Sequence, residues 1–389
     1  MIHATFTPEP DHVTALRHQL RRFVEEKAPR EKRLHWDKTH TWPRDVFAEL
    51  AAMGICGLTV GEEYGGLGQD VYAAVAVIEE LSRAGAFLAG PYIHCAFYGG
   101  MNISENGSPE QKAAYLPALA KGEMMMCYGL SEPDVGGDLS SVTTRGIIEG
   151  DEIVINGAKR WCTGADFADF IYCLIRTESD EKRKNLAFVL ILTGAPGVTL
   201  QPIEHVNLRY TLSSDVYFDQ VRIPVANIVG GPEKWGKGWG MLAGRALDVE
   251  KLEVAAVTFG IAQAAVEDAW RYAQERVQFG KVISGHQAIR HALVEARTKL
   301  QACRHMLYHA AYLAGANLPC GIETSMAKLF IADTAVEIAL ICQRVLGAYA
   351  LSDAFDMERH VRDLLGMRIV GGSSDMQKNN LAGLWGMKG

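Results

Sequence analysis

Two neighbouring segments of the chain offer groups that can hydrogen-bond a ligand. Residues 128–138 read Tyr-Gly-Leu-Ser-Glu-Pro-Asp-Val-Gly-Gly-Asp, which predicts a turn-rich loop that presents a hydroxyl and free backbone N–H groups. Residues 156–163 begin with Asn-Gly, a strong signal for a hairpin turn, and lead into a strand that carries Trp161 and Thr163. Taken alone, Trp161 is more simply a core aromatic and Thr163 an ordinary strand residue.

Hydrophobic periodicity predicts helices, then strands, then helices. The first helices are expected at residues 11–26, 43–53, 71–84 and 109–119. Strands are expected at residues 152–155, 170–175, 186–192, 198–202 and 215–218. Four late helices with one apolar side each, at 252–273, 290–313, 324–346 and 357–365, predict an antiparallel bundle. The fold class is therefore α+β, with domains at 1–124, 125–235 and 236–389.

The composition is that of an ordinary globular protein, with 48% hydrophobic and 22% charged residues. A net charge of -7 argues against a nucleic-acid partner, because phosphate binding needs a basic face, so the basic cluster Arg30, Lys32 and Arg33 is expected to be solvated. No apolar run is long enough to span a membrane. The eight cysteines are scattered without a C-x-x-C pair, which indicates reduced thiols in a cytoplasmic protein and no metal site.

Five motifs, in order along the chain, resemble those of the acyl-CoA dehydrogenase family. They are Glu-Glu-Tyr-Gly-Gly-Leu-Gly at 62–68, Ser-Glu-Pro at 131–133 with Trp-Cys-Thr at 161–163, Arg-Val-Gln-Phe-Gly at 276–280, Gln-Arg-Val-Leu-Gly-Ala at 343–348, and Glu-Arg-His-Val-Arg-Asp at 358–363. The chain departs from the family at Gly61, where proline is usual, and at Ala348, where a second glycine is usual. The resemblance covers essentially the whole chain. It implies an N-terminal helical domain, a middle β-barrel-like domain, a C-terminal four-helix bundle, FAD as cofactor and a homotetramer.

The resemblance also implies which residues contact FAD. In the group at the flavin ring, Leu130 and Ser131 would hydrogen-bond the pyrimidine edge of the flavin. Trp161 would cover one face of the ring, and Thr163 would donate a hydrogen bond near N5. The flavin-ring group is Tyr128, Leu130, Ser131, Gly136, Trp161 and Thr163, and the predicted cofactor-binding residue Gly137 stands where family members often have a serine that contacts the CoA arm. The second group would bind the pyrophosphate and adenosine of a neighbouring subunit's FAD, with Arg276 paired bidentately. This dinucleotide group is Arg276, Gln278, Phe279, Gln287, Gln343, Gly347, Ser373 and Asp375.

A catalytic base is implied as well. Oxidising a saturated thioester removes an α-proton while a β-hydride passes to flavin N5, and this weakly acidic proton requires a carboxylate in a dry pocket with a raised pKa. Many family members carry the glutamate in a Tyr-Glu-Gly-Thr motif, but residues 370–373 here are Val-Gly-Gly-Ser, so Gly371 stands in its place. Residues 247–252, Leu-Asp-Val-Glu-Lys-Leu, instead resemble the site in isovaleryl-CoA dehydrogenase, where the glutamate begins a long helix.

Glu250 is therefore the predicted base, and Gly371 is expected to leave room for its side chain. Without the resemblance, Glu250 would be a first-turn acid that the helix dipole favours. Asp248 and Glu253 are the fallback carboxylates, and both are expected to turn away from the face of Glu250.

The predicted function is the FAD-dependent α,β-dehydrogenation of an acyl thioester, with an electron-transfer flavoprotein as partner. Residues 371–377, Gly-Gly-Ser-x-Asp-Met-Gln, resemble the ending of crotonobetainyl-CoA reductase, so enoyl reduction stays open as the direction. The Glu250-Lys251 pair and the same ending also resemble flavoproteins that oxidise prolyl groups on carrier proteins, so the substrate is an acyl-CoA or a carrier-protein acyl or aminoacyl thioester. A different class also stays open, namely a non-redox lyase or a scaffold that retains FAD structurally.

Overall fold

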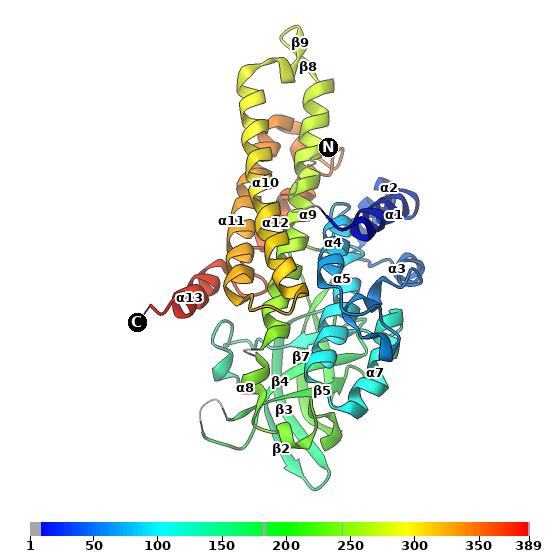
Figure 1. Ribbon diagram of the computed structural model, residues 1–389, viewed down its shortest axis with the longest axis vertical. Coiled ribbons are helices and arrows are strands. Elements are labelled where there is room, and N and C mark those ends of the chain that lie inside the picture. The colour runs from blue at the N-terminus through cyan, green and yellow to red at the C-terminus, as the bar shows by residue number, and fades with distance from the viewer. Residues whose placement is uncertain (1–8, 182–183, 243, 388–389) are drawn as a thin grey trace.

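The computed structural model describes residues 9–181, 184–242 and 244–387, with a helical N-terminal part, a sheet in the middle and long helices at the C-terminal end (Figure 1). The N-terminal part confirms the helices expected there and adds others. Its α-helices are α1 (Asp11–Lys27), α2 (Arg30–Thr39), α3 (Arg44–Ala51), α4 (Val71–Ser82), α5 (Ala89–Ile93), α6 (Asn102–Asn106) and α7 (Pro109–Lys121). A π-helix, η3 (His94–Met101), joins α5 to α6.

The helix α2 was not predicted, and two members of the basic cluster are not simply solvated. Arg30 Nε lies 3.0 Å from Asp356 Oδ1, and Arg33 Nη1 lies 3.4 Å from Asp356 Oδ2. The cluster therefore helps to attach the N-terminal helices to the C-terminal part of the chain. Arg30 and Arg33 thus form ion pairs within the protein, and their partner Asp356 is far away in the sequence.

The middle part is a curled sheet in which all strands but one follow a single path. Its strands are β1 (Met126–Gly129), β2 (Arg145–Glu149), β3 (Glu152–Thr163), β4 (Phe170–Arg176), β5 (Leu186–Leu192), β6 (Val198–Ile203) and β7 (Ser213–Pro224). The order in this seven-stranded sheet is β1-β4-β2-β3-β7-β6, with β5 paired to β4. The runs of buried residues along β4 and β5 explain their continuous apolar sequences.

The hairpin turn predicted at Asn156-Gly157 is wrong. The structure places both residues inside β3, and the turn between β2 and β3 lies at Gly150 and Asp151. The pairing of β3 with β7 shifts between Ile155 and Gly157, so the Asn-Gly pair forms a β-bulge. Gly157 has φ +143°, and a Cβ there would lie 2.6 Å from the backbone of Thr144, which explains the glycine.

The C-terminal part is built on three long helices and also contains three short ones (Figure 1). Its helices are α8 (Gly238–Leu242), α9 (Arg245–Glu275), α10 (Gln287–Gly315), α11 (Gly321–Leu346), α12 (Met357–Gly366) and α13 (Ser374–Leu384). The predicted bundle corresponds to α9, α10, α11 and α12, and α13 was not predicted. A small hairpin of β8 (Val277–Gln278) and β9 (Lys281–Val282) joins α9 to α10 at the end of the molecule away from the sheet (Figure 1).

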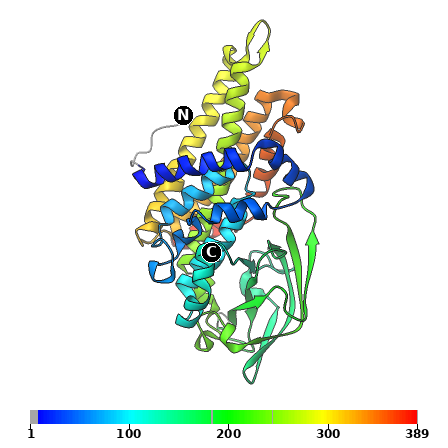
Figure 2. The same ribbon diagram turned by 90° about the vertical axis from the view of Figure 1, so that its right-hand side faces the viewer.

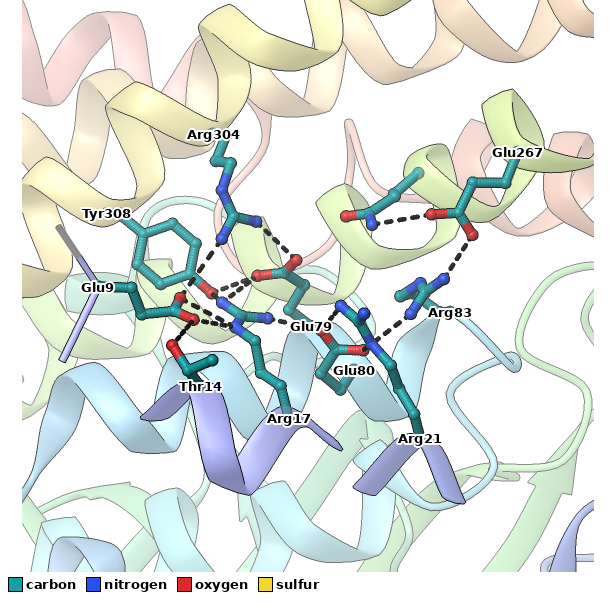
Figure 3. A network of polar contacts seen from close by, with 11 residues as sticks. Glu9, Thr14, Arg17, Arg21, Glu79, Glu80, Arg83, Glu267, Arg304 and Tyr308 are labelled. Carbon is teal, nitrogen blue, oxygen red and sulfur yellow. Dashed lines mark hydrogen bonds and ion pairs between the residues drawn. The ribbon is translucent and has the colours of Figure 1, made fainter. Parts of the chain in front are cut away.

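A buried ionic network ties the N-terminal helices to this bundle (Figure 3). Arg17 of α1 lies 2.8 Å from Glu79 and 2.8 Å from Glu80, both on α4. Arg304 of α10 pairs with Glu79 at 2.9 Å, and the hydroxyl of Tyr308 donates to the same carboxylate. Figure 2 shows α1 lying across the helices that this network connects. Because the charges are buried, each depends on its partners.

The other expectations from composition concern the cysteines and the membrane. All eight cysteines are free and buried, as expected for thiols that pack as small apolar groups. Among the described residues, no helix is long and apolar enough to cross a membrane. In the same ranges, no cluster of three or more histidine, cysteine or acidic side chains is arranged to hold a metal ion.

Candidate active site

Glu250 lies in the second turn of α9 with its carboxyl group turned into the protein. Its Oε2 is buried and makes no hydrogen bond within the described chain. Burial raises the pKa of Glu250 to about 8, and the positive charge of Lys251 opposes this rise. A carboxylate in such an environment is proton-seeking near neutral pH, as a general base must be.

Glu253 lies beside Glu250, so the expectation that it turns away is wrong. Residues three apart on a helix share a face, and the sequence-based reasoning overlooked this spacing. Glu253 is only 1% exposed, and neither of its carboxylate oxygens makes a hydrogen bond of acceptable geometry. Burial and the negative charge of Glu250 raise its pKa well above the usual value, while the hydroxyl of Tyr98 opposes the rise.

Asp248 has a different environment, and the expectation for it is confirmed. Its Oδ1 accepts a hydrogen bond from Lys251 Nζ at 2.6 Å. Its carboxylate also lies against Gly321, where an added Cβ would come within 3.0 Å of Asp248 Oδ2. Asp248 therefore faces the start of α11 and forms an ion pair with Lys251. Glu250 and Glu253 are then the acids that belong to the site.

An aromatic wall stands next to these two acids. The ring of Tyr98, from η3, stacks on that of Tyr128, from β1, with centroids 4.1 Å apart. Burial, followed by the charges of Glu250 and Glu253, raises the pKa of both phenols. A small cavity of about 10 Å³, with room for about one water molecule, adjoins this wall. It is lined by Asn102, Tyr128, Leu130, Tyr172, Phe188, Met241, Leu242 and Leu247.

The loop after β1 is held rigidly by a buried ion pair. Lys159 Nζ lies 2.9 Å from Glu132 Oε1 and donates to the carbonyl of Leu130 at 3.1 Å. Burial opposes the ionisation of Glu132, but Lys159 and hydrogen bonds from Thr143 lower the pKa of Glu132 to about 2. The backbone of Leu130 and Ser131 is thus fixed at the edge of the cavity, where the sequence predicts hydrogen bonds to the flavin.

Trp161 is not a core aromatic, since its side chain is 53% exposed. The pairing of β3 with β7 shifts between Lys159 and Cys162, and Trp161 has φ +61° at this bulge. Residues with bulky side chains rarely adopt the left-handed backbone conformation, so the backbone at Trp161 is strained. This conformation turns the indole ring outward. The N–H of Arg160 donates to the carbonyl of Ser131 at 2.9 Å, which makes the two predicted flavin segments neighbours.

The other predicted flavin-ring residues lie around the same region. Thr163 Oγ1 is 2.9 Å from Ser213 Oγ on β7, and the hydroxyl of Tyr128 accepts a hydrogen bond from Asn102 at 2.6 Å. Gly136 has open space at its Cβ position. An added Cβ at Gly137 would lie 2.7 Å from Met376 Sδ on α13. The sheet loop therefore meets α13 at Gly137.

The predicted dinucleotide residues form a separate group. Arg276 caps the end of α9, and Phe279, which is 94% exposed with φ +53°, lies in the turn of the β8–β9 hairpin. The guanidinium of Arg276 lies over the ring of Tyr349, which follows α11. Gln343 and Gly347 end α11, and the positive φ of Gly347 requires glycine there. Gln278 lies on β8 and Gln287 begins α10, so this group surrounds the hairpin.

Ser373 and Asp375 stand at the start of α13. The Ser373 hydroxyl accepts a hydrogen bond from the N–H of Met376 at 3.2 Å and so caps the helix. Asp375 is exposed and pairs with Lys378 at 2.9 Å. Contacts of either residue with adenosine stay a prediction.

The residues present fit a bound flavin at the sheet. An exposed, strained Trp161, a rigid loop at Ser131 and a proton-seeking Glu250 are features that packing alone does not explain. Sequence reasoning named Glu253 only as a fallback carboxylate and missed Tyr98. The signal for Glu253 was present, because this acid sits within the apolar stripe of α9 between Leu252 and Ala256.

The comparisons with known proteins agree with this picture. Three family models match the chain: acyl-CoA dehydrogenase N-terminal domain at residues 10–123, middle domain at 127–221 and C-terminal domain at 236–383. An acyl-CoA dehydrogenase of Bacillus subtilis is 33% identical over 94% of this chain and 97% of its own length. A 3-(aryl)acrylate reductase of Clostridium sporogenes is 33% identical over 89% of this chain and 91% of its own.

Among solved structures, the butyryl-CoA dehydrogenase of Megasphaera elsdenii superimposes with a TM-score of 0.93 at 26% identity, covering 98% of this chain and 100% of that one. This agreement confirms the predicted fold of helical, sheet and helical parts. The matches to all three domain models, with relatives aligned over nearly their full length, show that the chain belongs to the acyl-CoA dehydrogenase family, an oxidoreductase that acts on CH–CH groups with FAD as its cofactor.

Proposed function

We propose that this protein catalyses the α,β-dehydrogenation of an acyl thioester, with Glu250 removing the α-proton. The observation that carries the proposal is the carboxyl group of Glu250, which is buried, unpaired at Oε2 and raised in pKa to about 8. Bound FAD supplies the acceptor for the β-hydride. The role of the chain is to hold a base in a dry site, orient the thioester against it and exclude water.

The space around Gly371 supports Glu250 as the base. A Cβ added at Gly371 would lie 2.5 Å from Val254 Cγ2, and Val254 follows Glu250 by one helical turn. A glutamate at position 371 would therefore collide with α9 unless Val254 moved. The three atoms nearest to that Cβ position all belong to Val254, so position 371 is closed to a side chain, and the acid that α9 supplies lies one helical turn before Val254.

Lys251, the cation that follows Glu250 in the sequence, does not fully offset the raised pKa of the base. Lys251 is held by Asp248 at 2.6 Å, so its charge lowers the pKa of Glu250 only partly. Glu250 thus keeps a high proton affinity. In the reverse direction, the same carboxyl group would return a proton to the α-carbon of an enoyl thioester. The 33% identical relative named 3-(aryl)acrylate reductase supports keeping that direction as the second candidate.

The decisive experiment is anaerobic reduction of the flavin by a panel of acyl-CoA and carrier-bound thioesters. The wild-type protein is expected to lose its yellow colour with the right saturated thioester. Glu250→Gln is expected to stay yellow and folded but to slow bleaching by about 10²- to 10⁴-fold, the usual contribution of a general base. Glu267→Gln on the same helix, whose carboxylate pairs with Arg83, is the matched control and should bleach normally.

Two outcomes would contradict the proposal. Undiminished bleaching in Glu250→Gln would remove Glu250 from the mechanism. Thioesters that perturb the flavin spectrum of the wild-type protein without reducing it would favour the non-redox lyase or the structural-FAD scaffold. An electron-transfer flavoprotein as the electron acceptor and a homotetramer as the assembly remain part of this proposal.

A further inference from the structure

Two hydroxyl groups face each other where β3 ends and β7 begins. Thr163 Oγ1 lies 2.9 Å from Ser213 Oγ, and either oxygen can be the donor of this hydrogen bond. The two residues are direct partners in the pairing of the strands, so their side chains lie on the same side of the sheet. In the described part of the chain, each hydroxyl makes this hydrogen bond alone. The pair therefore keeps one proton that it can donate to a group outside the pair.

The backbone of Ser213 is held in place by a histidine. The N–H of Ser213 donates to His205 Nε2 at 3.3 Å, and His205 Nδ1 lies 2.6 Å from the carbonyl oxygen of Asn207. Because Nε2 accepts a hydrogen bond, the imidazole carries its proton on Nδ1 and donates it to Asn207. Ser213 is only 7% exposed, so its hydroxyl is fixed beside Thr163 and is largely shielded from water.

The place of this hydroxyl pair relates it to the cofactor. Thr163 is predicted to hydrogen-bond near flavin N5, and Trp161, two residues before it, is the exposed ring at the bulge of β3. Thr163 itself is half-buried. In a flavin, N5 accepts a hydrogen bond in the oxidised form and donates one in the reduced form, because reduction adds a hydrogen there. A hydroxyl that contacts N5 in both forms must therefore change from donor to acceptor.

We propose that Ser213 is a positioning residue that lets the Thr163 hydroxyl change roles when FAD is reduced. Beside oxidised FAD, Ser213 donates to Thr163, and Thr163 donates toward N5. Beside reduced FAD, Thr163 accepts from N5 and turns its own proton to Ser213 Oγ. The two hydroxyls only rotate, so no bond to hydrogen breaks and no proton is gained or lost. If the Ser213 hydroxyl were removed, the Thr163 proton would lack an acceptor in the reduced state alone.

The midpoint potential of the bound flavin measures this difference between the two states. The holoenzyme is reduced with dithionite beside a reference dye and without any thioester, so the result depends neither on Glu250 nor on the acyl group. Ser213→Ala leaves a donor without an acceptor in the reduced state, which should lower the equilibrium constant for reduction about fivefold. For a two-electron couple, this fold-change corresponds to a potential that is lower by about 20 mV.

Two matched comparisons separate the hydroxyl from the space that it fills. The side chains in Ser213→Thr and Ser213→Val have the same shape and differ in the hydroxyl. Ser213→Thr is therefore expected to keep the wild-type potential, and Ser213→Val to lower it as Ser213→Ala does. Ser214→Ala removes the hydroxyl of the next residue, which is buried and makes no hydrogen bond in the described chain, and should leave the potential unchanged.

A double variant tests whether Ser213 acts through Thr163. In Thr163→Val the link to N5 is already absent, so adding Ser213→Ala should not lower the potential further. A hydroxyl that acted on the flavin by another route would keep its full effect in this background.

The inference is overturned if Ser213→Ala leaves the potential unchanged, if Ser214→Ala lowers it equally, or if Ser213→Ala keeps its full effect beside Thr163→Val. A lower Tm at constant potential in Ser213→Ala would mean that the hydroxyl only supports the sheet. Should Ser213→Ala fail to fold, Ser213→Thr and Ser213→Val decide the question in the same way. Failure of every thioester to bleach the flavin would count against the proposed function and would leave this measurement intact.

Discussion

The guanidinium of Arg276 lies 5.7 Å from the centre of the Tyr349 ring, and this contact joins the end of α9 to the segment after α11. Most of the predicted dinucleotide residues of one chain are gathered around the β8–β9 hairpin, whereas Ser373 and Asp375 lie at the start of α13, the helix that meets the sheet loop at Gly137. Trp161 and Ser131 lie on the sheet part, at the other end of the long helices (Figure 1). Within one copy of the chain, the residues around the hairpin and those on the sheet part lie apart, as expected if the predicted oligomer forms.

The exposed ring of Phe279 provides a test of this assembly. Phe279→Ser is expected to weaken association and lower FAD occupancy, while the free energy of unfolding of the single chain changes by less than about 0.5 kcal/mol, because the ring makes few contacts within its own chain. Light scattering and the ratio of flavin to protein absorbance measure the two effects. Ile147→Ser, which removes another exposed apolar side chain at 41% exposure on β2, is the control. Unchanged assembly in Phe279→Ser would contradict a role for the hairpin in the interface.

The titration of Glu250 predicts the pH dependence of flavin reduction. The base must be ionised to accept a proton, and its pKa is raised to about 8. The rate constant kcat/KM should therefore rise about tenfold per pH unit below pH 8 and level off above it. A profile that is flat from about pH 6 to pH 9 would contradict the assignment.

The same shifts predict how stability depends on pH. The pKa of Glu250 is raised from 4.5 to about 8 in the folded state, and that of Glu253 is raised well above its usual value, so the folded protein holds more protons than the unfolded chain between pH 4.5 and pH 8. Stability should therefore decrease as pH rises through this window. Glu253→Gln should reduce that decrease, as measured by Tm of the apoprotein at several pH values. An identical slope in both proteins would show that Glu253 has an ordinary pKa.

The strained backbone at Trp161 predicts a conflict between stability and flavin binding. Trp161→Gly is expected to raise the free energy of unfolding of the FAD-free protein by about 1 kcal/mol, because glycine tolerates φ +61°. The same change should weaken flavin retention, measured by fluorescence of released FAD. Gln220→Gly, at φ +52° on β7, is the control that relieves strain without affecting the flavin. Loss of stability in Trp161→Gly would mean that packing of the ring outweighs the strain.

The buried network at Arg17 predicts a large effect far from the active site. Arg17→Met leaves Glu79 and Glu80 without one of their partners and should cost about 3–5 kcal/mol of stability, measured by urea unfolding. Arg222→Met removes an exposed arginine that pairs with Glu149 and Glu152 and should change stability little. If both variants lost equal stability, burial would not be the reason that the network matters.

The fold was predictable because its signals are long and repeated. The apolar stripe of α9 runs from Leu252 to Ala273, and motifs from residue 62 to residue 363 follow the order of one family. What failed depended on contacts between distant segments. The Asn-Gly pair at 156–157 is a bulge because β7 and Thr144 lie against it, and no local pattern reveals them. The partner of Arg33 is Asp356, which the local sequence does not indicate.

Only part of the candidate site could be predicted from the sequence, again because local signals are visible there and contacts between distant segments are not. Glu250 was identified from its sequence context, and its burial and raised pKa support that choice. Glu253 was misjudged because helical spacing was applied wrongly. The outward turn of Trp161 could not be foreseen, since it arises from a shift in strand pairing at Lys159 and Cys162.

The distance between the β8–β9 hairpin and the sheet has a consequence for mixed populations of the protein. If one copy completes the cofactor pocket of another, a subunit with a substituted Arg276 would weaken FAD binding in its neighbour's pocket. The same subunit would keep its own Glu250 intact. Two inactive variants, one altered at Arg276 and one at Glu250, would then regain part of their activity when refolded together. Each chain defective at Arg276 would still disable one pocket, but that pocket would belong to its neighbour.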